Sequence, residues 1–171
     1  SPLFSVLIPT RNRPKLTADL INSVLSQNFL DFELIVADNS SDEETQAILR
    51  NISDPRLINL KTGGLNMAEN WETGITKCSG SYLLLFSDKM VLKEGSLDYL
   101  ATYIKKYSPD CVNWDIESFF DNELTYIKNK PSSDEATIKS SSLLEKILTS
   151  EFDSVRIPCH CNSAISMSVI K

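Results

Sequence analysis

The sequence predicts an α/β fold, with a mainly parallel sheet and helices on both of its faces. Short apolar runs typical of buried strands alternate with longer segments whose apolar residues recur at helical spacing. A length of 171 residues with 42% hydrophobic residues suits one well-buried domain and is short for two. Right-handed crossovers between parallel strands would make the sheet doubly wound.

Two strand and helix pairs are expected near the start of the chain. Residues 4–8 predict the first strand, and Pro9 is expected to stop its ladder because proline has no N–H to donate. A polar loop over residues 10–14 leads into a helix, and residues 32–38 predict the second strand, followed by a short helix from about 42 to 51. The residues expected to face the core from these helices are Leu16, Leu20, Ile21, Val24, Leu25, Ile48, Leu49 and Ile52.

The same alternation continues through the middle of the chain. Residues 57–60 predict a third strand, and a glycine pair at 63–64 opens a loop before a helix from about 66 to 77. An apolar run over residues 81–87 predicts a buried fourth strand, and a helix over about 95–107 follows it. The residues expected on the buried stripes of these helices are Met67, Trp71, Ile75, Cys78, Leu97, Leu100, Ile104 and Tyr107.

The pattern becomes less regular after Pro109. Residues 111–114 and 162–170 predict two further strands. A hairpin with an edge strand over 124–127 and a short helix over about 143–148 are expected between them. This stretch therefore defines the fold less clearly than the first hundred residues do.

The four cysteines do not form a recognisable zinc motif. Cys159 and Cys161 flank His160, which departs from the Cys-x-x-Cys spacing of structural zinc sites, and no second ligand pair is present in the sequence. Cys78 and Cys111 lie in apolar, periodic segments and are expected to be reduced core residues.

Composition excludes several classes of function. The formal net charge of −6 argues against nonspecific binding of nucleic acid, which needs many basic contacts to phosphate. No apolar segment approaches the roughly 18 residues that span a bilayer, and no signal peptide pattern is visible, so a cytoplasmic location is expected. The Gly-x-Gly-x-x-Gly, P-loop and Gly-x-Ser-x-Gly motifs are absent, which argues against dinucleotide oxidoreductases, nucleotide triphosphatases and serine hydrolases.

Two predicted strands end in a carboxylate. Asp38 closes the second strand and Asp88 follows the fourth, each beside residues that favour turns. Ligands of open α/β sheets bind beyond the carboxyl ends of the strands. We therefore expect these acids to form a polar rim where chemistry takes place, although either acid could instead cap an ordinary turn.

Four segments resemble the successive signatures of family 2 glycosyltransferases. They are residues 5–13 (SVLIPTRNR), 24–29 (VLSQNF), 32–41 (FELIVADNSS) and 80–88 (GSYLLLFSD). Residues 67–72 (MAENWE) also resemble a subset of that family. The resemblance covers about the first hundred residues and implies the GT-A fold, a Rossmann-like nucleotide-binding domain.

The resemblance implies inverting transfer of a sugar from a nucleoside-diphosphate-sugar donor to an acceptor hydroxyl. Its expected setting is the synthesis of a bacterial surface polysaccharide or lipid-linked glycan, at the inner face of the membrane. The residues that it implies for the donor nucleotide are Pro9, Thr10, Arg11, Asp38, Asn39, Asn66, Asn70, Ser87 and Asp88. It also implies a Mn²⁺ or Mg²⁺ ion at Asp88, which would neutralise charge on the leaving diphosphate.

The sequence departs from the family in its acidic motifs. Relatives have two or three acids after the fourth strand, whereas Asp88 is followed here by Lys89 and Met90. A metal on one carboxylate would depend on donor phosphates and water for its other ligands, and Lys89 could instead meet the diphosphate directly. Asn39 stands where many relatives have a second Asp.

The catalytic base is not identified by the sequence. In the family it follows the strand that corresponds to residues 162–167, so it is expected beyond Lys171. The chain is accordingly expected to be a single GT-A domain over residues 1–171 that is truncated at its C-terminus. Asp115 and Glu117 are weak candidates for the base.

Two other functions remain open at this point. One is a sugar-nucleotide-binding module without turnover, which the reduced acidic motif would suit. The other is a nucleotidyltransferase, which would be expected to carry a glycine-rich basic loop after the first strand; residues 10–14 contain no glycine. The nucleotide, sugar, acceptor and oligomeric state are not determined by any motif.

Overall fold

The computed structural model describes residues 1–114 and 163–170 of the chain. The chain divides into two compact units, Ser1–Val112 with Ala164–Lys171, and Asn113–Ser163. Nearly all of the second unit lies outside the described residues. So do the expected hairpin, the helix near residues 143–148, the Cys159-His160-Cys161 segment, Asp115 and Glu117. A single domain over 1–171 stays a prediction.

A six-stranded sheet forms the centre of the described structure, with strand order β3-β2-β1-β4-β6-β5. The three pairings among the first four strands are parallel, and β6 runs antiparallel to β4. The strands are β1 (Phe4–Thr10), β2 (Phe32–Asp38), β3 (Leu57–Lys61), β4 (Tyr82–Leu85), β5 (Cys111–Asn113) and β6 (Ser163–Ser166). The mainly parallel α/β sheet predicted from the sequence is confirmed.

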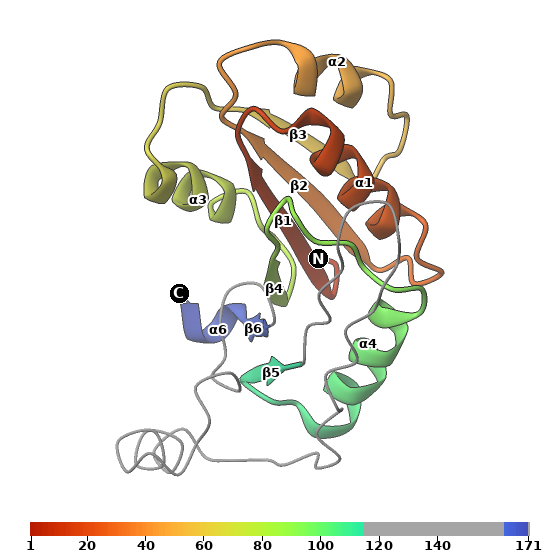
Figure 1. The fold of residues 1–171 in the computed structure, drawn as a ribbon. Helices are drawn as coiled ribbons and strands as arrows, with labels where there is room; N and C mark the ends of the chain where they lie inside the picture. The colour runs from red at the N-terminus through yellow and green to blue at the C-terminus, as the bar shows by residue number, and fades with distance from the viewer. Residues whose placement is uncertain (115–162, 171) are drawn as a thin grey trace, which may run out of the picture. The chain divides into compact units, whose positions relative to one another are not determined.

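Helices cover both faces of the sheet. Figure 1 shows α3 on one side of the parallel strands and α1 and α2 on the other. Local sequence explains where these helices begin, because Pro14 occupies the first turn of α1 and Asn66 and Glu69 form a capping box at α3. The helices are α1 (Pro14–Leu25), α2 (Glu44–Arg50), α3 (Met67–Ile75), α4 (Ser96–Tyr107) and α6 (Met167–Ile170). No helix among the described residues is long and apolar enough to cross a membrane.

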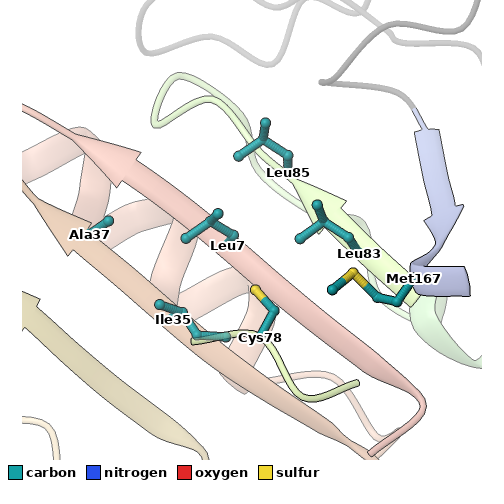
Figure 2. Packing of buried hydrophobic residues seen from close by; sticks show 7 residues of the cluster. All are labelled: Leu7, Ile35, Ala37, Cys78, Leu83, Leu85 and Met167. Carbon is teal, nitrogen blue, oxygen red and sulfur yellow. The ribbon is translucent and has the colours of Figure 1, made fainter. Parts of the chain in front are cut away.

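An apolar cluster fills the space between the sheet and α3. Its buried members are Leu7, Ile35, Ala37, Cys78, Leu83, Leu85 and Met167, drawn in Figure 2, and Leu60, Trp71 and Ile75 pack against them. Helix α3 approaches closely at Gly74, where a Cβ atom would lie 2.6 Å from Leu7 Cδ1. Burial raises the pKa of the Cys78 thiol to about 11, which keeps it protonated at neutral pH. Cys78 is thus the reduced core residue that was expected.

Proline 9 does not stop strand β1, contrary to expectation. It pairs with Ala37, and β1 continues to Thr10. The amide of Phe86 donates to the carbonyl of Leu7 at 2.9 Å, and β4 ends at Leu85. In a strand, the backbone groups of residues 7 and 9 point to the same side, so the nitrogen of Pro9 points toward the β4 side of β1. At the level of Pro9, β4 has already ended, and no strand on that side needs a donor. The proline therefore removes no ladder hydrogen bond.

Several positions predicted to be buried by helical spacing are exposed. Leu16, Met67 and Tyr107 are exposed, and so is Cys111 on the last strand of the sheet order. In α1 the buried position of the first turn belongs to Thr17, and in α3 the buried positions are Asn70 and Gly74. The two polar residues are buried because they make hydrogen bonds, and Gly74 is buried because it lets α3 pack closely against the sheet. The spacing of apolar residues in the sequence cannot predict either kind of burial.

The last predicted strand is too long. Residues 162–170 were expected to form one strand, but β6 ends at Ser166 and α6 begins at Met167. The amide of Met167 donates to the carbonyl of Ser81 at 2.8 Å, and its side chain enters the apolar cluster. The chain therefore turns where Met167 becomes anchored to the start of β4.

At the amino end of the sheet, Glu33 on β2 connects β1 to the loop that precedes β4. Its carboxylate accepts hydrogen bonds from the Ser5 hydroxyl, from the amide and hydroxyl of Ser79, and from the Gly80 amide. No side chain fits at Gly80, where a Cβ atom would lie 2.6 Å from the Ser5 nitrogen. Burial raises the pKa of Glu33, but these donors outweigh burial and hold the pKa below its ordinary value of 4.5.

Replacing Glu33 by Gln should lower the free energy of unfolding by about 1–2 kcal/mol near neutral pH, because an acceptor oxygen is lost. The wild-type advantage should be fully present above a pH of 4.5 and should disappear as pH falls through the lowered folded-state pKa. Urea unfolding of both proteins across that range measures this. Glu72→Gln, on the exposed surface of α3, is the control. A Glu33→Gln deficit that did not shrink in acid would contradict the assignment.

Candidate functional site

The parallel strands end together at one polar edge of the sheet. Thr10 pairs with Asp38, so β1 and β2 finish at the same level. Strand β4 is followed by a turn in which the Met90 amide donates to the Ser87 carbonyl at 3.1 Å, and Asp88 and Lys89 are the central residues of this turn. The structure thus places both predicted acids at the carboxyl edge of the sheet, where ligands of such folds bind.

The Asp88 carboxylate joins the turn after β4 to the end of β1 and to the residue that precedes α1. Oδ2 accepts a hydrogen bond from the Thr10 hydroxyl at 3.0 Å, and Oδ1 accepts one from Nη1 of Arg13 at 2.9 Å. The Thr10 hydroxyl also lies 2.7 Å from the Thr17 hydroxyl on α1. Asp88 is only 4% exposed, whereas the Arg13 side chain is 46% exposed. The acid is therefore fixed in place, and its cationic partner remains accessible to a ligand.

Asp38 is held more deeply than Asp88. Its Oδ1 accepts from the Ser40 amide at 3.0 Å, its Oδ2 accepts from Gln46 Nε2 at 2.7 Å, and the residue is 1% exposed. Gln46 and Asn59 exchange a pair of amide hydrogen bonds, at 3.1 and 2.9 Å. The amide pair connects α2 to β3 and fixes the orientation of the Asp38 carboxylate.

Asn39 and Asn12 hold the loops around this edge. The Asn39 side chain donates to the carbonyl of Leu65 at 2.7 Å and accepts from its amide at 3.0 Å. Asn12 adopts a positive φ of 55°, and its Oδ1 accepts from the Ser41 amide at 2.9 Å. Asn39 therefore draws the loop before α3 onto the site, using both ends of its amide.

The two other predicted asparagines make contacts within the fold. Asn66 caps α3, where its Oδ1 accepts from the Glu69 amide at 3.0 Å. Asn70 is buried, donates to the Ala37 carbonyl at 3.1 Å and accepts from the Thr62 hydroxyl at 2.6 Å. Asn70 thus fastens α3 to the ends of β2 and β3. A direct donor contact by either residue stays a prediction.

The remaining predicted residues lie along the same edge. Pro9 is half-buried within β1, and Arg11 is exposed in the loop that follows. The half-buried Ser87 accepts a long hydrogen bond of 3.4 Å from the Lys89 amide. Their roles in nucleotide binding stay predictions.

Sequence reasoning missed three residues that organise the site, namely Arg13, Thr17 and Gln46. Arg11 was favoured over Arg13, yet Arg13 pairs with Asp88. Pro14 is the signal that was available, since a proline in the first turn of α1 places Arg13 directly before the helix. Thr17 and Gln46 gave no signal, because polar residues on a helix are normally assigned to its solvent face.

A divalent metal does not fit the residues described at this edge. Among residues 1–114 and 163–170, no three His, Cys, Asp or Glu side chains are grouped as metal ligands. Both oxygens of Asp88 already have partners, and Arg13 brings a positive charge within 2.9 Å of Oδ1. Mg²⁺ and Mn²⁺ favour several oxygen ligands, and repulsion from a guanidinium opposes their binding. The described residues of this edge therefore do not form a site for a divalent metal.

The sequence also matches a known protein family and several characterised relatives. The model of the family described as Glycosyl transferase family 2 matches residues 5–171. The chain is 32% identical over 106 residues to the GalNAc(5)-diNAcBac-PP-undecaprenol beta-1,3-glucosyltransferase of Campylobacter jejuni, covering 58% of this chain and 33% of that protein. It is 29% identical over 108 residues to the abequosyltransferase RfbV of Salmonella typhimurium, covering 60% and 32%. The chain thus matches about a third of the length of these relatives.

Solved structures share the fold at low sequence identity. S. aureus TarS 1-349 in complex with UDP-GlcNAc has a TM-score of 0.59 at 23% identity, over 70% of this chain and 36% of that one. The mannosyltransferase PcManGT of Pyrobaculum calidifontis, in complex with GDP-Man and Mn²⁺, has a TM-score of 0.58 at 17% identity, over 68% and 36%. The predicted GT-A fold is confirmed by these neighbours.

Replacing Gln46 by Leu should lower the free energy of unfolding by about 2–3 kcal/mol, because a buried carboxylate oxygen and the Asn59 amide both lose their partner. Chemical denaturation measures the loss. Glu44→Leu on the same helix is the control, since Glu44 is exposed, and it should cost less than about 1 kcal/mol. Equal losses in the two variants would show that Gln46 does not support Asp38.

Proposed function

The chain belongs to glycosyl transferase family 2, whose model matches residues 5–171, and we propose that it transfers a sugar from a nucleoside-diphosphate-sugar donor to an acceptor hydroxyl with inversion at the anomeric carbon. The observation that carries the proposal is the edge where Thr10, Asp38 and Asp88 meet. Both acids are buried, and hydrogen bonds fix their orientation. A binding site needs side chains that are held in position in this way before the ligand arrives.

The donor is assigned from the chemistry of this edge. Carboxylates and amides at the end of β2 suit the hydrogen-bonding groups of a base and ribose, and the accessible Arg13 suits a phosphate. TarS and PcManGT, solved with UDP-GlcNAc and GDP-Man, support a sugar nucleotide as the ligand class. Pro9, Thr10, Arg11, Asn39, Asn66, Asn70 and Ser87 complete the proposed donor site.

Catalysis would require charge stabilisation on the leaving diphosphate and a base for the acceptor hydroxyl. Residues at the carboxyl edge would hold the donor and stabilise the leaving group. The base is proposed to lie beyond Lys171, with Asp115 and Glu117 as the weaker candidates. The Mn²⁺ or Mg²⁺ ion that was expected at Asp88 is left out of the proposed mechanism: PcManGT was solved with Mn²⁺, but the Asp88 carboxylate is paired here with Arg13.

The proposed acceptor is a glycan or a lipid-linked sugar in bacterial surface polysaccharide synthesis. The Campylobacter relative is named for an undecaprenol-linked substrate, and a Myxococcus xanthus relative is named an O-antigen biosynthesis protein. Such an acceptor would place the enzyme in the cytoplasm at the inner face of the membrane. A sugar-nucleotide-binding module without turnover is the second candidate, because Asp88 is followed by Lys89 and Met90 instead of further acids.

The donor site is tested by thermal unfolding with UDP, GDP, dTDP and CMP, each with Mn²⁺ or with EDTA. One nucleotide at a hundredfold excess over its dissociation constant should stabilise the chain by about 2.7 kcal/mol. For a chain of this size, that corresponds to a rise in midpoint of roughly 5–10 °C. Asp38→Ala should abolish the rise, whereas the control Asp19→Ala, at an exposed position of α1, should retain it.

Two results would count against the proposal. If no nucleotide raises the midpoint with Mn²⁺ or EDTA, the donor site is not formed by this chain. If the nucleotide binds but the sugar nucleotide yields neither transfer to a glycan acceptor nor hydrolysis, the binding module becomes the better description.

A further inference from the structure

We propose that the diphosphate of the donor is neutralised by two side-chain cations, Arg13 and Lys89, in place of a divalent metal ion. The inference rests on the proposed function and specifies how that site binds its substrate. It starts from the ion pair between Arg13 and Asp88, which already places a cation against the carboxylate expected to hold a metal. It adds the residue that follows Asp88 in the same turn.

Arg13 can contact Asp88 and a ligand at the same time. A guanidinium has five N–H donors, and Asp88 takes one of them through Nη1 at 2.9 Å. The side chain is 46% exposed, so within the described structure it retains donors and a solvent-facing surface for a phosphate. Asp88 is 4% exposed and also held by Thr10, which fixes the direction from which the guanidinium is presented.

Lys89 brings the second cation to the same edge. Asp88 and Lys89 are the two central residues of the turn from Ser87 to Met90, and Lys89 is exposed. A lysine ammonium is a point charge on a flexible stem, which suits contact with a phosphate whose position varies during transfer. Lys89 therefore adds a second accessible positive charge beside Asp88, in addition to that of Arg13.

The two arrangements, a metal on Asp88 or the two side-chain cations, can be compared by their formal charge. One carboxylate with one divalent ion carries a net charge of about +1, and Asp88 with Arg13 and Lys89 carries the same net charge. Both arrangements would therefore bring the same formal charge to a leaving diphosphate. They differ in that a metal would have to displace Arg13 from Oδ1 of Asp88, against repulsion between like charges.

The experiment compares Arg13→Gln and Lys89→Gln with the wild-type chain by isothermal titration in EDTA. The ligands are the nucleoside diphosphate that stabilises the chain (UDP, GDP or dTDP) and its nucleoside. Each variant should bind the nucleoside diphosphate about 10- to 100-fold more weakly, as expected for losing a hydrogen bond to a charged group. Binding of the nucleoside, which has no phosphate, should be unchanged. Exchanging EDTA for Mn²⁺ should alter wild-type affinity by less than about twofold.

Two further variants separate charge from folding. Lys77→Gln removes an exposed positive charge just after α3, near the amino end of β4, and should bind like wild type. Arg13→Lys keeps the charge but loses the planar fork, and should recover part of the affinity lost in Arg13→Gln. Thermal midpoints without ligand show whether each variant is folded.

The outcomes distinguish this inference from the proposed function. Diphosphate binding that requires Mn²⁺ would overturn the inference and leave the donor site intact. Arg13→Gln and Lys89→Gln affinities equal to that of Lys77→Gln would overturn it as well. Absence of binding to any nucleotide, with either Mn²⁺ or EDTA, would overturn the proposed function and the inference with it.

Discussion

The parallel pairing of β1 with both of its neighbours is the constraint on which the rest of the structure depends. β1 pairs with β2 along its whole length and with β4 over its first four residues. Its register aligns Thr10 with Asp38, and the early end of β4 leaves room for the turn that carries Asp88. The site residues come from distant parts of the sequence and are brought together because β1 and β2 end at one level, beside the turn that follows the shorter β4.

Burying carboxylates at that edge has a cost that the hydrogen bonds offset. An isolated buried carboxylate loses several kcal/mol of solvation unless its oxygens find donors. Asp38 finds two neutral donors, a backbone amide and the Gln46 amide. Asp88 finds a hydroxyl and a cation. Both acids are thereby fixed before any ligand arrives, which reduces the ordering that binding must accomplish.

The sequence predicted the strands of this sheet better than the faces of its helices. The run from Phe32 to Asp38 was located to the residue, because a strand buried on both faces is an uninterrupted apolar segment. Pro9 was assigned wrongly, because its effect depends on where β4 ends. Met67 was placed in the core but is exposed, and the buried position in the first turns of α3 belongs to Asn70, which donates a hydrogen bond to the Ala37 carbonyl. Tertiary partners of this kind leave no periodic signature.

The acids at the two ends of the sheet have different partners, and the difference separates the Glu33 contacts from the proposed donor site. Glu33, at the amino end, is satisfied by two serines and backbone amides, all neutral groups that also close the loop into β4. Asp88, at the carboxyl end, is satisfied in part by an arginine whose side chain is nearly half exposed. The donors around Glu33 tie neighbouring segments of the fold together and bring no positive charge to that end of the sheet. A half-exposed cation fixed by a buried acid retains charge and donors for an incoming anion, which supports the proposed diphosphate site at Asp88.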